Sequence, residues 1–456
     1  MTRIRQVITK LSGAGNVNYV IVESRHIGRI LQAHLDELVA NTQVLATSGH
    51  LYDYKFHENK IHLVPIQTQA IDAISKLNGK NIIVATDPDP QGNLIAEHIK
   101  SLTPNSEHRR CIFSDLTKSG VLVSLNRFNK RQFEFDERNA LKGALVKVAN
   151  LHLRHNGKGN SGHYQTTTGI ELAKQFANIG RVNNVTSRTF ERNGVHYRCN
   201  VPSSFGEATN MGRPSPIVTK QIIANKSLEG RSLNVADHLQ DAFINGRLSY
   251  TRTDFSKLPA FSEKIINEYT TNGDQIDIDH HLEFNGNAPH YAIHNLAAPF
   301  SPLERMIQIH NQSSLVTKYN DTNIVTFENG HTLIASANEH CPTRTTLPPA
   351  NECAVLLSLS SDSSPAILES SGARYAKHFY NGNQLNQPII SNTLNIAEKH
   401  FPALTSQGLD ATLEKALDSG VSLTDSLTHL ELDNPSKNKK SQEINNGLLD
   451  SIEFKN

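Results

Sequence analysis

The stretch of sequence that decides the fold runs Ile82-Ile83-Val84-Ala85-Thr86-Asp87-Pro88-Asp89-Pro90-Gln91-Gly92. Its four apolar residues predict a buried strand, and the Asp and Pro residues that follow favour a turn. A helical pattern through Leu94 and Ile99 comes next. Two carboxylates two residues apart on such a loop, Asp87 and Asp89, can share one Mg²⁺, a hard cation that prefers oxygen ligands. A plain turn explains the same residues, so the loop alone leaves both interpretations open.

Two more predicted strands lie upstream, and each ends in a polar group. Residues 18–24 form a short apolar strand that ends in the carboxylate of Glu23, and a helical pattern follows it. Residues 44–51 form a second strand that runs into Gly49 and His50. In α/β sheets, ligands bind beyond the carboxyl ends of the strands. Glu23 is therefore a candidate active-site acid, with an exposed turn glutamate as the alternative.

A second candidate site lies further along the chain, in Arg247-Leu248-Ser249-Tyr250-Thr251-Arg252-Thr253-Asp254-Phe255. A tyrosine hydroxyl has a pKa of about 10 and is a poor nucleophile while protonated. Tyr250 would need a neighbouring cation to favour its phenolate and to hold a phosphate, and Arg252 could do both. In an extended segment these two side chains share one face, opposite Thr251 and Thr253. The alternative is an ordinary β-prone run in which Tyr250 is half-buried.

Taken in order, these motifs resemble those of a known enzyme family. Val-Ile-Val-Glu at 20–23, Ser-Gly-His-Leu at 48–51 and Asp-Pro-Asp-x-x-Gly at 87–92 resemble the toprim module that topoisomerases share with bacterial primases. Phe-Ser-Asp-Leu-Thr-Lys at 113–118 stands where the family has Phe-x-Glu-Leu/Ile-Thr. Ser-Tyr-Thr-Arg-Thr-Asp at 249–254 is similar to the active-site segment of type IA DNA topoisomerases. The set is slightly more similar to the topoisomerase III branch.

Two further segments extend the resemblance. Residues 179–186 look like the family's Gly-Arg-Val-Gln-x-Pro-Thr, where the family begins a helix that binds single-stranded DNA. Residues 288–294 resemble its His-x-Ala-Ile motif, which makes His290 the counterpart of the active-site histidine. The resemblance implies that Arg181, Asn183 and His50 contact DNA.

The resemblance also implies a reaction. Tyr250 would attack a backbone phosphorus and form a 5′-phosphotyrosine link, Arg252 would neutralise the transition state, and Glu23 would protonate the leaving 3′-oxygen. Asp87 and Asp89, with Glu23, would hold Mg²⁺ for religation. His290 would belong to the phosphate network. The bond energy is conserved, and the sequence contains no Gly-x-x-x-x-Gly-Lys-Ser/Thr nucleotide loop, so no ATP use is expected.

The expected fold class is a multidomain α/β (toprim) protein with α-helical and β-rich hinge domains, arranged as a type IA topoisomerase-like torus. The expected domains run in this order: toprim, 17–126; helical DNA-binding domain, first part, 127–195; hinge domain, first part, 196–230; catalytic tyrosine domain, 231–312; β-rich hinge domain, second part, 313–365; a divergent helical part, 366–433; and a polar tail, 434–456. Strands are expected throughout residues 322–358, with a hairpin turn at Asn329-Gly330.

The sequence departs from the family at specific positions. The family's acidic loop, Asp-x-Asp-Arg-Glu-Gly, has Pro90 in place of the arginine and Gln91 in place of the third acid. The family's late Gly-Ile-Gly segment is missing from residues 360–430. The first hypothesis is an active topoisomerase. The second is a catalytically impaired toprim-family protein that binds single-stranded DNA, and a toprim nuclease or primase is the third.

Composition bounds these hypotheses. The chain has 456 residues, 37% hydrophobic and 20% charged, with a net charge of +1. It is long enough for several domains, and this charge does not by itself indicate nucleic-acid binding. DNA as the partner therefore rests on the resemblance, and we expect a monomer. Without a signal peptide or a long apolar run, we expect a cytoplasmic protein with no membrane association. The four cysteines are scattered, which argues against a zinc ribbon.

Overall fold

A computed structural model describes residues 17–39, 41–57, 60–130, 134–156, 166–230, 235–260, 269, 281–283, 290–337, 346–360 and 375–418. The chain divides into two compact units. Unit 1 comprises residues 1–160 and 397–456, and unit 2 comprises residues 161–396. Each unit is described by itself below.

Unit 1 is built on a four-stranded parallel sheet in the order β2-β1-β5-β6. The strands are β1 (Asn18–Val22), β2 (Thr42–Ala46), β5 (Asn81–Val84) and β6 (Glu107–Arg110). Ile21 of β1 pairs with Leu45 on one side and with Val84 on the other. The carboxyl ends of β1 and β5 therefore lie next to each other.

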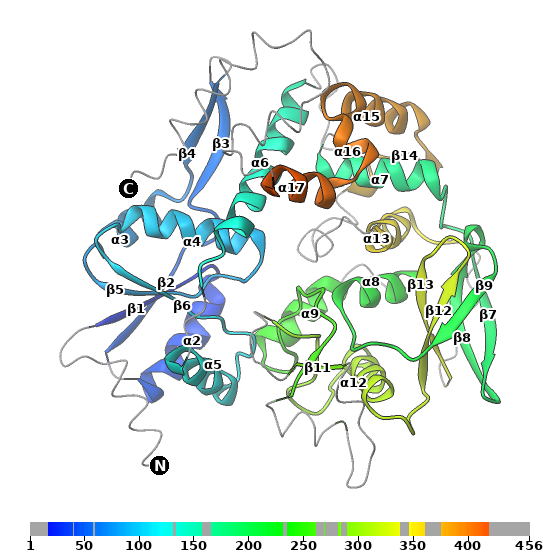
Figure 1. Cartoon of the computed structure of the whole chain (residues 1–456), viewed down its shortest axis with the longest axis horizontal. Coiled ribbons are helices and arrows are strands. Elements are labelled where there is room, and N and C mark those ends of the chain that lie inside the picture. Colours follow the sequence, from blue (N-terminus) through cyan, green and yellow to red (C-terminus); the bar gives the residue numbers. More distant parts are fainter. Residues whose placement is uncertain are drawn as a thin grey trace. The chain divides into compact units, whose positions relative to one another are not determined.

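Helices cover both faces of this sheet, as Figure 1 shows, with α3 and α4 on one face and α2 and α5 on the other. Their bounds are α2 (Arg25–Leu38), α3 (Thr68–Ser75), α4 (Pro90–Leu102) and α5 (Lys118–Lys130). Fully buried Ile21, Val84, Ile95 and Ile99 form the centre of the core under α4. Burial on both faces explains why the two central strands, β1 and β5, are apolar runs without alternation.

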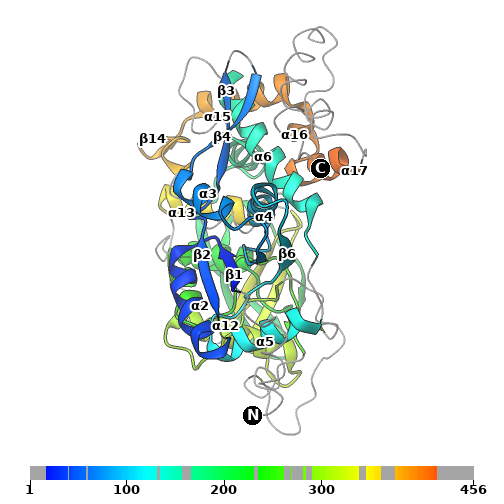
Figure 2. The same cartoon turned by 90° about the vertical axis from the view of Figure 1, so that its left-hand side faces the viewer.

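A hairpin of β3 (Tyr52–His57) and β4 (Lys60–Pro65) projects from this sheet and packs against α6 (Glu137–Asn156), as Figure 2 shows. Helix α6 also packs along α4. A Cβ atom on Gly143 of α6 would lie 2.4 Å from the Pro90 carbonyl oxygen. A glycine inside a helix costs about 1 kcal/mol relative to alanine, and here this close packing requires it.

The last described helices of unit 1 are α16 (Pro402–Ser406) and α17 (Leu409–Asp418). Helix α17 lies on α6, and ion pairs join the two helices. Glu414 Oε1 lies 2.8 Å from Lys142 Nζ, and Glu414 Oε2 lies 2.6 Å from Arg138 Nη2.

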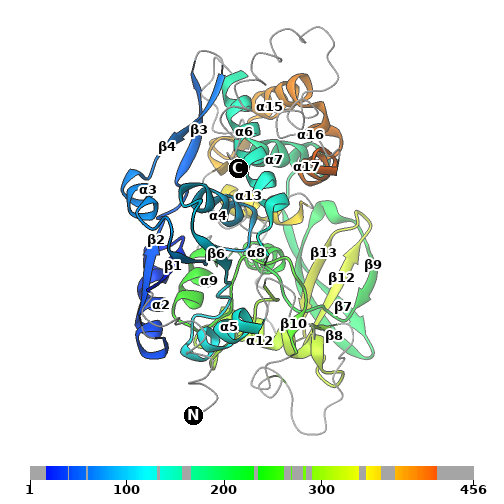
Figure 3. The same cartoon turned by 60° about the vertical axis from the view of Figure 1, so that its left-hand side comes forward.

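Unit 2 contains a five-stranded antiparallel sheet in the order β7-β8-β13-β12-β9, which Figure 3 shows. Its strands are β7 (Val185–Arg192), β8 (Val195–Pro202), β9 (Ala208–Gly212), β12 (Thr322–Phe327) and β13 (Thr332–Ser336), with a short 3₁₀ helix, η1 (Ser203–Phe205), before β9. Strands β12 and β13 form the hairpin predicted around Gly330, whose φ of 78° suits a glycine.

The helices of unit 2 pack around one large core with this sheet. They are α7 (Thr167–Asn178), α8 (Thr219–Leu228), α9 (Val235–Ile244), α12 (Pro302–Leu315), α13 (Pro349–Leu359) and α15 (Gln387–His400), whose last turn falls within unit 1. Two short strand pairs complete the unit: β10 (Leu258–Pro259) with β11 (Leu282–Glu283), and β14 (Tyr380–Asn381) with β15 (Gln384–Leu385).

Several predicted elements are confirmed, and others are wrong. The strands that lead to Glu23 and to Asp87 end close to where the sequence predicted, whereas the second strand, β2, ends at Ala46, before Gly49 and His50. The expectation of strands throughout 322–358 is wrong, because residues 349–359 form α13. This segment is apolar on every side and buried, so its sequence lacks the period that distinguishes a helix from a strand. The expected polar tail, 434–456, lies outside the described residues.

Two sequence expectations concern the whole chain. Within the described ranges, no helix is long and apolar enough to cross a membrane. Among the described residues, Cys111, Cys199 and Cys353 are buried and form no disulfide, and Cys341 lies outside the described residues. The boundaries predicted for the individual domains stay predictions.

Candidate active site

Three of the predicted acids lie at the carboxyl ends of neighbouring strands in unit 1. Glu23 directly follows β1, and its carbonyl oxygen accepts a hydrogen bond from Ser48 N at 2.9 Å. Ser24 caps the N-terminus of α2. Asp87 and Asp89 lie in the acidic loop, residues 86–92, which follows β5. Because β1 and β5 are paired, both sets of carboxylates belong to one edge of the sheet.

The acidic loop is held by its own backbone. Asp89 caps α4, since its Oδ1 accepts a hydrogen bond from Gly92 N at 2.8 Å. Thr86 Oγ1 donates to Gly92 O at 2.7 Å. A Cβ atom on Gly92 would lie 2.1 Å from Asp87 O, so only glycine fits. The loop is thus fixed in shape, and one of its two acids already serves the helix.

Arg110, which the sequence analysis missed, supports the acidic loop and the end of β5 through hydrogen bonds to their backbone. Arg110, at the end of β6, is only 1% exposed. Its guanidinium donates to Val84 O at 3.1 Å and to Asp87 O at 2.9 Å. An arginine in a strand next to β5 was the only signal in the sequence.

His50 and Gln91 lie together in unit 1. The Gln91 side chain lies close enough to His50 to act on its pKa. Burial, with the positive charges of Lys147 and His98, lowers the pKa of His50 to about 3. Lys147 itself pairs with Asp53 at 3.2 Å. His50 is therefore neutral near pH 7, and it can orient Gln91 or donate one hydrogen bond, but it supplies no positive charge for a phosphate.

The donor set at this edge partly fits Mg²⁺. Carboxylates of Glu23, Asp87 and Asp89 are hard oxygen ligands of the kind this ion prefers. However, across the described ranges no group of three or more His, Cys, Asp or Glu side chains is close enough to hold a metal ion. One oxygen of Asp89 is already engaged at the cap of α4, and Gln91 supplies a neutral amide where a third acid would add negative charge. The side chains are therefore of the chemical type that Mg²⁺ prefers, but within the described residues they do not form a complete metal site.

The tyrosine segment, residues 249–255, belongs to unit 2 and forms no regular strand. An isolated bridge between Leu248 and Asn295 lies just before the segment. The tyrosine segment itself pairs with no strand in the described structure. Thr219, the first residue of α8, holds the segment instead. Its hydroxyl lies 2.6 Å from Thr251 O and 3.0 Å from Thr253 O, and accepts from Thr253 N at 3.0 Å.

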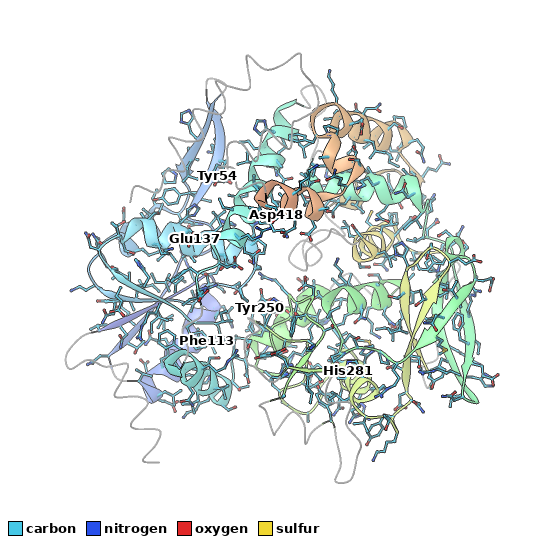
Figure 4. All side chains as sticks on the ribbon, viewed as in Figure 1. Tyr54, Phe113, Glu137, Tyr250, His281 and Asp418 are labelled. Atoms are coloured by element: carbon cyan, nitrogen blue, oxygen red, sulfur yellow. The ribbon has the colours of Figure 1, made fainter. Side chains whose placement is uncertain are left out.

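Burial along the tyrosine segment sets Arg252 apart from its neighbours. Thr251 and Thr253 are fully buried, while Arg252 is partly exposed. Tyr250, labelled in Figure 4, is 4% exposed, and its ring packs edge-on against Phe243 of α9 at 5.7 Å. Little of the Tyr250 side chain is therefore accessible to solvent.

His290 lies beside the tyrosine. The two ring centroids are 6.0 Å apart, and His290 Nδ1 is 2.8 Å from Thr253 Oγ1. When the threonine donates this hydrogen bond, Nε2 of His290 carries the ring proton. His290 thus lies beside Tyr250 and is hydrogen-bonded to Thr253, in the segment that also contains Arg252. The sequence analysis did not assign the supporting residues Thr253 and Thr219.

Arg181 and Asn183 belong to another part of unit 2. Arg181 Nη2 lies 3.6 Å from Glu352 Oε2, and its guanidinium lies over the Tyr380 ring at 5.6 Å. Glu352 is fully buried and also accepts hydrogen bonds from Val182 N and from the Tyr380 hydroxyl. Arg181 is thus engaged within the protein, although a third of its side chain is exposed.

The helix expected to begin at this segment is not present. Residues 181–184 are irregular, and β7 follows them. The backbone of Asn183 accepts from Leu347 N at 2.7 Å, which ties the segment to the start of α13. Val185 and Thr186 then enter β7, and the β-branched side chains favour this strand.

Comparisons with known proteins support the fold. Residues 18–116 match the model of the Toprim domain. The structure is similar to full-length topoisomerase I from Thermotoga maritima, with a TM-score of 0.55 and 12% sequence identity over 96% of this chain and 90% of that one. Among curated proteins, none matches the sequence. The predicted fold class, an α/β toprim domain combined with helical and β-rich parts as in type IA topoisomerases, is confirmed.

Proposed function

We propose that this chain is a type IA DNA topoisomerase, which cleaves and rejoins one DNA strand without ATP. The observation that carries the proposal is the local structure of Tyr250, Arg252 and His290 in a fold similar to a whole topoisomerase. A tyrosine with only a structural role would need no partly exposed arginine two residues further along the chain. It would also need no histidine beside its ring that is held by a hydrogen bond to Thr253.

In this proposal the Tyr250 hydroxyl gives up its proton to solvent, the resulting phenolate oxygen forms a bond to a backbone phosphorus, and the bond from phosphorus to the 3′-oxygen breaks. Arg252 stabilises the charge that develops on the phosphate oxygens. Glu23 gives its proton to the leaving 3′-oxygen and takes it back during religation. His290, oriented by Thr253, donates a hydrogen bond to the phosphate from Nε2.

Magnesium is part of the proposal through the acids of unit 1. Glu23, Asp87 and Asp89 would hold the ion, which when bound would position the 3′-end for religation. Single-stranded DNA as the substrate, a role for Arg181, Asn183 and His50 in binding it, a cytoplasmic location and the slight preference for the topoisomerase III branch stay predictions.

A second candidate function is a DNA-binding relative that lacks strand cleavage. It is favoured by Gln91, which stands where the family has an acid and lies beside the neutral His50. It is also favoured by Asp89, whose carboxylate caps α4. On this account the metal affinity is too low for turnover.

A relaxation assay separates the two candidates. The protein is incubated with negatively supercoiled plasmid, without ATP, in Mg²⁺ or in EDTA. The proposal predicts a ladder of topoisomers in Mg²⁺ that is lost in EDTA and in Asp87→Asn. Binding of single strands without any change of linking number, even at high Mg²⁺, would support the second candidate.

A further inference from the structure

An exposed aromatic side chain lies beside the chain segment that leads into Tyr250. Phe300 is 83% exposed, whereas the other exposed large hydrophobic residues of the described ranges, Val17, Ile66 and Val123, are 40–45% exposed. The guanidinium of Arg247 lies 5.5 Å from the centre of the Phe300 ring. One side of the ring therefore carries a cation, and most of its surface is open to solvent.

One buried carboxylate holds both members of this pair. Glu304 of α12 is 2% exposed. Its Oε1 accepts from Arg247 Nε at 3.0 Å, and its Oε2 accepts from the backbone N–H of Phe300 at 2.7 Å. Both groups are thus fixed to the start of α12, so little conformational freedom would be lost on binding a ligand.

The usual structural role of such a residue does not apply here. Phe300 precedes Ser301, the N-cap of α12. An apolar residue at this position often packs against the fourth residue of the helix. That residue is Arg305, which is exposed, so no such apolar contact forms. Packing therefore does not explain why a phenylalanine stands here.

The pair is close to the proposed nucleophile. Arg247 lies three residues before Tyr250, and its carbonyl oxygen accepts from Leu296 N at 2.8 Å. Three residues of chain span at most about 10 Å. A DNA strand bound at Tyr250 would therefore pass Arg247 within a few nucleotides, since stacked bases rise about 3.4 Å each.

We propose that Phe300 and Arg247 form a stacking platform for one unpaired base of the DNA strand that Tyr250 attacks, with the Arg247 charge also attracting the adjacent phosphate. This inference rests on the proposed function. Every base has a flat aromatic face, so an exposed ring next to an arginine binds single strands with little sequence preference. Duplex DNA keeps its bases stacked inside and offers no such face.

The test measures binding apart from cleavage. Kd is determined by fluorescence anisotropy for a labelled single strand of about 20 nucleotides, longer than the site sizes known for such grooves. All proteins carry Tyr250→Phe, and the buffer contains EDTA. The variants are Phe300→Leu, which keeps apolar bulk but removes the ring; Phe300→Trp, which keeps a ring; and Val123→Ala as a control at another exposed apolar position.

We expect Phe300→Leu to weaken binding about 5- to 100-fold, with Phe300→Trp and Val123→Ala close to the parent protein. A strand of the same length in which every nucleotide is abasic offers no base for stacking in any register, so it should bind the parent more weakly than the intact strand. With the abasic strand Phe300→Leu should add no further loss, because the base and the ring act as a pair. Thermal melting should be the same for all variants, since Phe300 is exposed.

The inference is overturned if Phe300→Leu binds every oligonucleotide as tightly as the parent. It is also overturned if Phe300→Leu loses as much affinity for the fully abasic strand as for the intact strand. Covalent DNA capture by the native enzyme, together with either result, removes this inference alone. Ring-dependent binding without capture removes the proposed catalysis and leaves the platform in place. Absence of single-strand binding by the parent removes both.

Discussion

The acidic loop and the tyrosine segment carry the two halves of the proposed chemistry, and they are held in different ways. In the acidic loop, backbone groups make most of the contacts: Arg110 donates to main-chain carbonyls, and Gly92 lies against Asp87. In the tyrosine segment, side-chain hydroxyls do this work, above all that of Thr219, which is 32 residues before Thr251 in the chain. The stability of the acidic loop should therefore depend on the close packing of its backbone at Gly92. The stability of the tyrosine segment should depend on single hydroxyl groups such as that of Thr219.

The largest expected effect is on the acidic loop. Gly92→Ala places a Cβ atom 2.1 Å from the Asp87 oxygen, so the loop must shift. We expect a loss of about 3 kcal/mol in the free energy of unfolding, measured by urea denaturation. Gly212→Ala is the matched control, since a Cβ atom there meets nothing within 4 Å and should change stability little. Equal effects of the two substitutions would contradict the close packing of the loop.

The next effect is on the tyrosine segment. Thr219→Val keeps the shape of the side chain but leaves Thr253 N and two carbonyl oxygens without their hydroxyl partner. We expect a loss of about 2 kcal/mol and a larger loss of covalent DNA capture. Thr219→Ser keeps the hydroxyl and should retain most of both. If the valine variant captures DNA as well as the serine variant, the hydroxyl does not position Tyr250.

A smaller effect concerns pH at the acidic loop. The pKa of His50 is about 3 in the folded protein, below its ordinary value of 6.5. As pH falls below 6.5, the unfolded chain therefore binds a proton that the folded protein does not, and stability is lost until about pH 3. For His50 alone the loss should reach about 1 to 2 kcal/mol at pH 5. His50→Gln should flatten this slope in denaturation curves measured from pH 7 to pH 5, and an unchanged slope would contradict the burial of a neutral His50.

The same contrast explains what the sequence could predict. The strand, turn and helix of the acidic loop follow from local patterns, and Glu23 was found because a parallel sheet places its strand ends together. The tyrosine segment was found through its motif, but its conformation was not, because it depends on a threonine distant in the chain. Arg110 was missed for a similar reason, since only the strand order brings β6 beside β5.

Buried charge was the other feature that the sequence did not reveal. Arg181 was expected to meet DNA, and the structure shows it paired with Glu352, 171 residues later, and lying over Tyr380. An ion pair between two residues so far apart in the chain leaves no periodic pattern in the sequence from which it could be predicted. The assignment of α13 as strand failed similarly, because a segment buried on all sides shows neither a helical nor a strand period.

The most direct test of the central claim is covalent capture of DNA by Tyr250. The protein is mixed with a single-stranded oligonucleotide labelled at its 3′-end or its 5′-end, and SDS is added before electrophoresis. A 5′-phosphotyrosine link predicts that only the 3′-label stays with the protein, that Tyr250→Phe abolishes this band, and that Tyr197→Phe, at another buried tyrosine of unit 2, leaves it unchanged. Bound DNA with no label retained after SDS, or a band that survives in Tyr250→Phe, would contradict the claim.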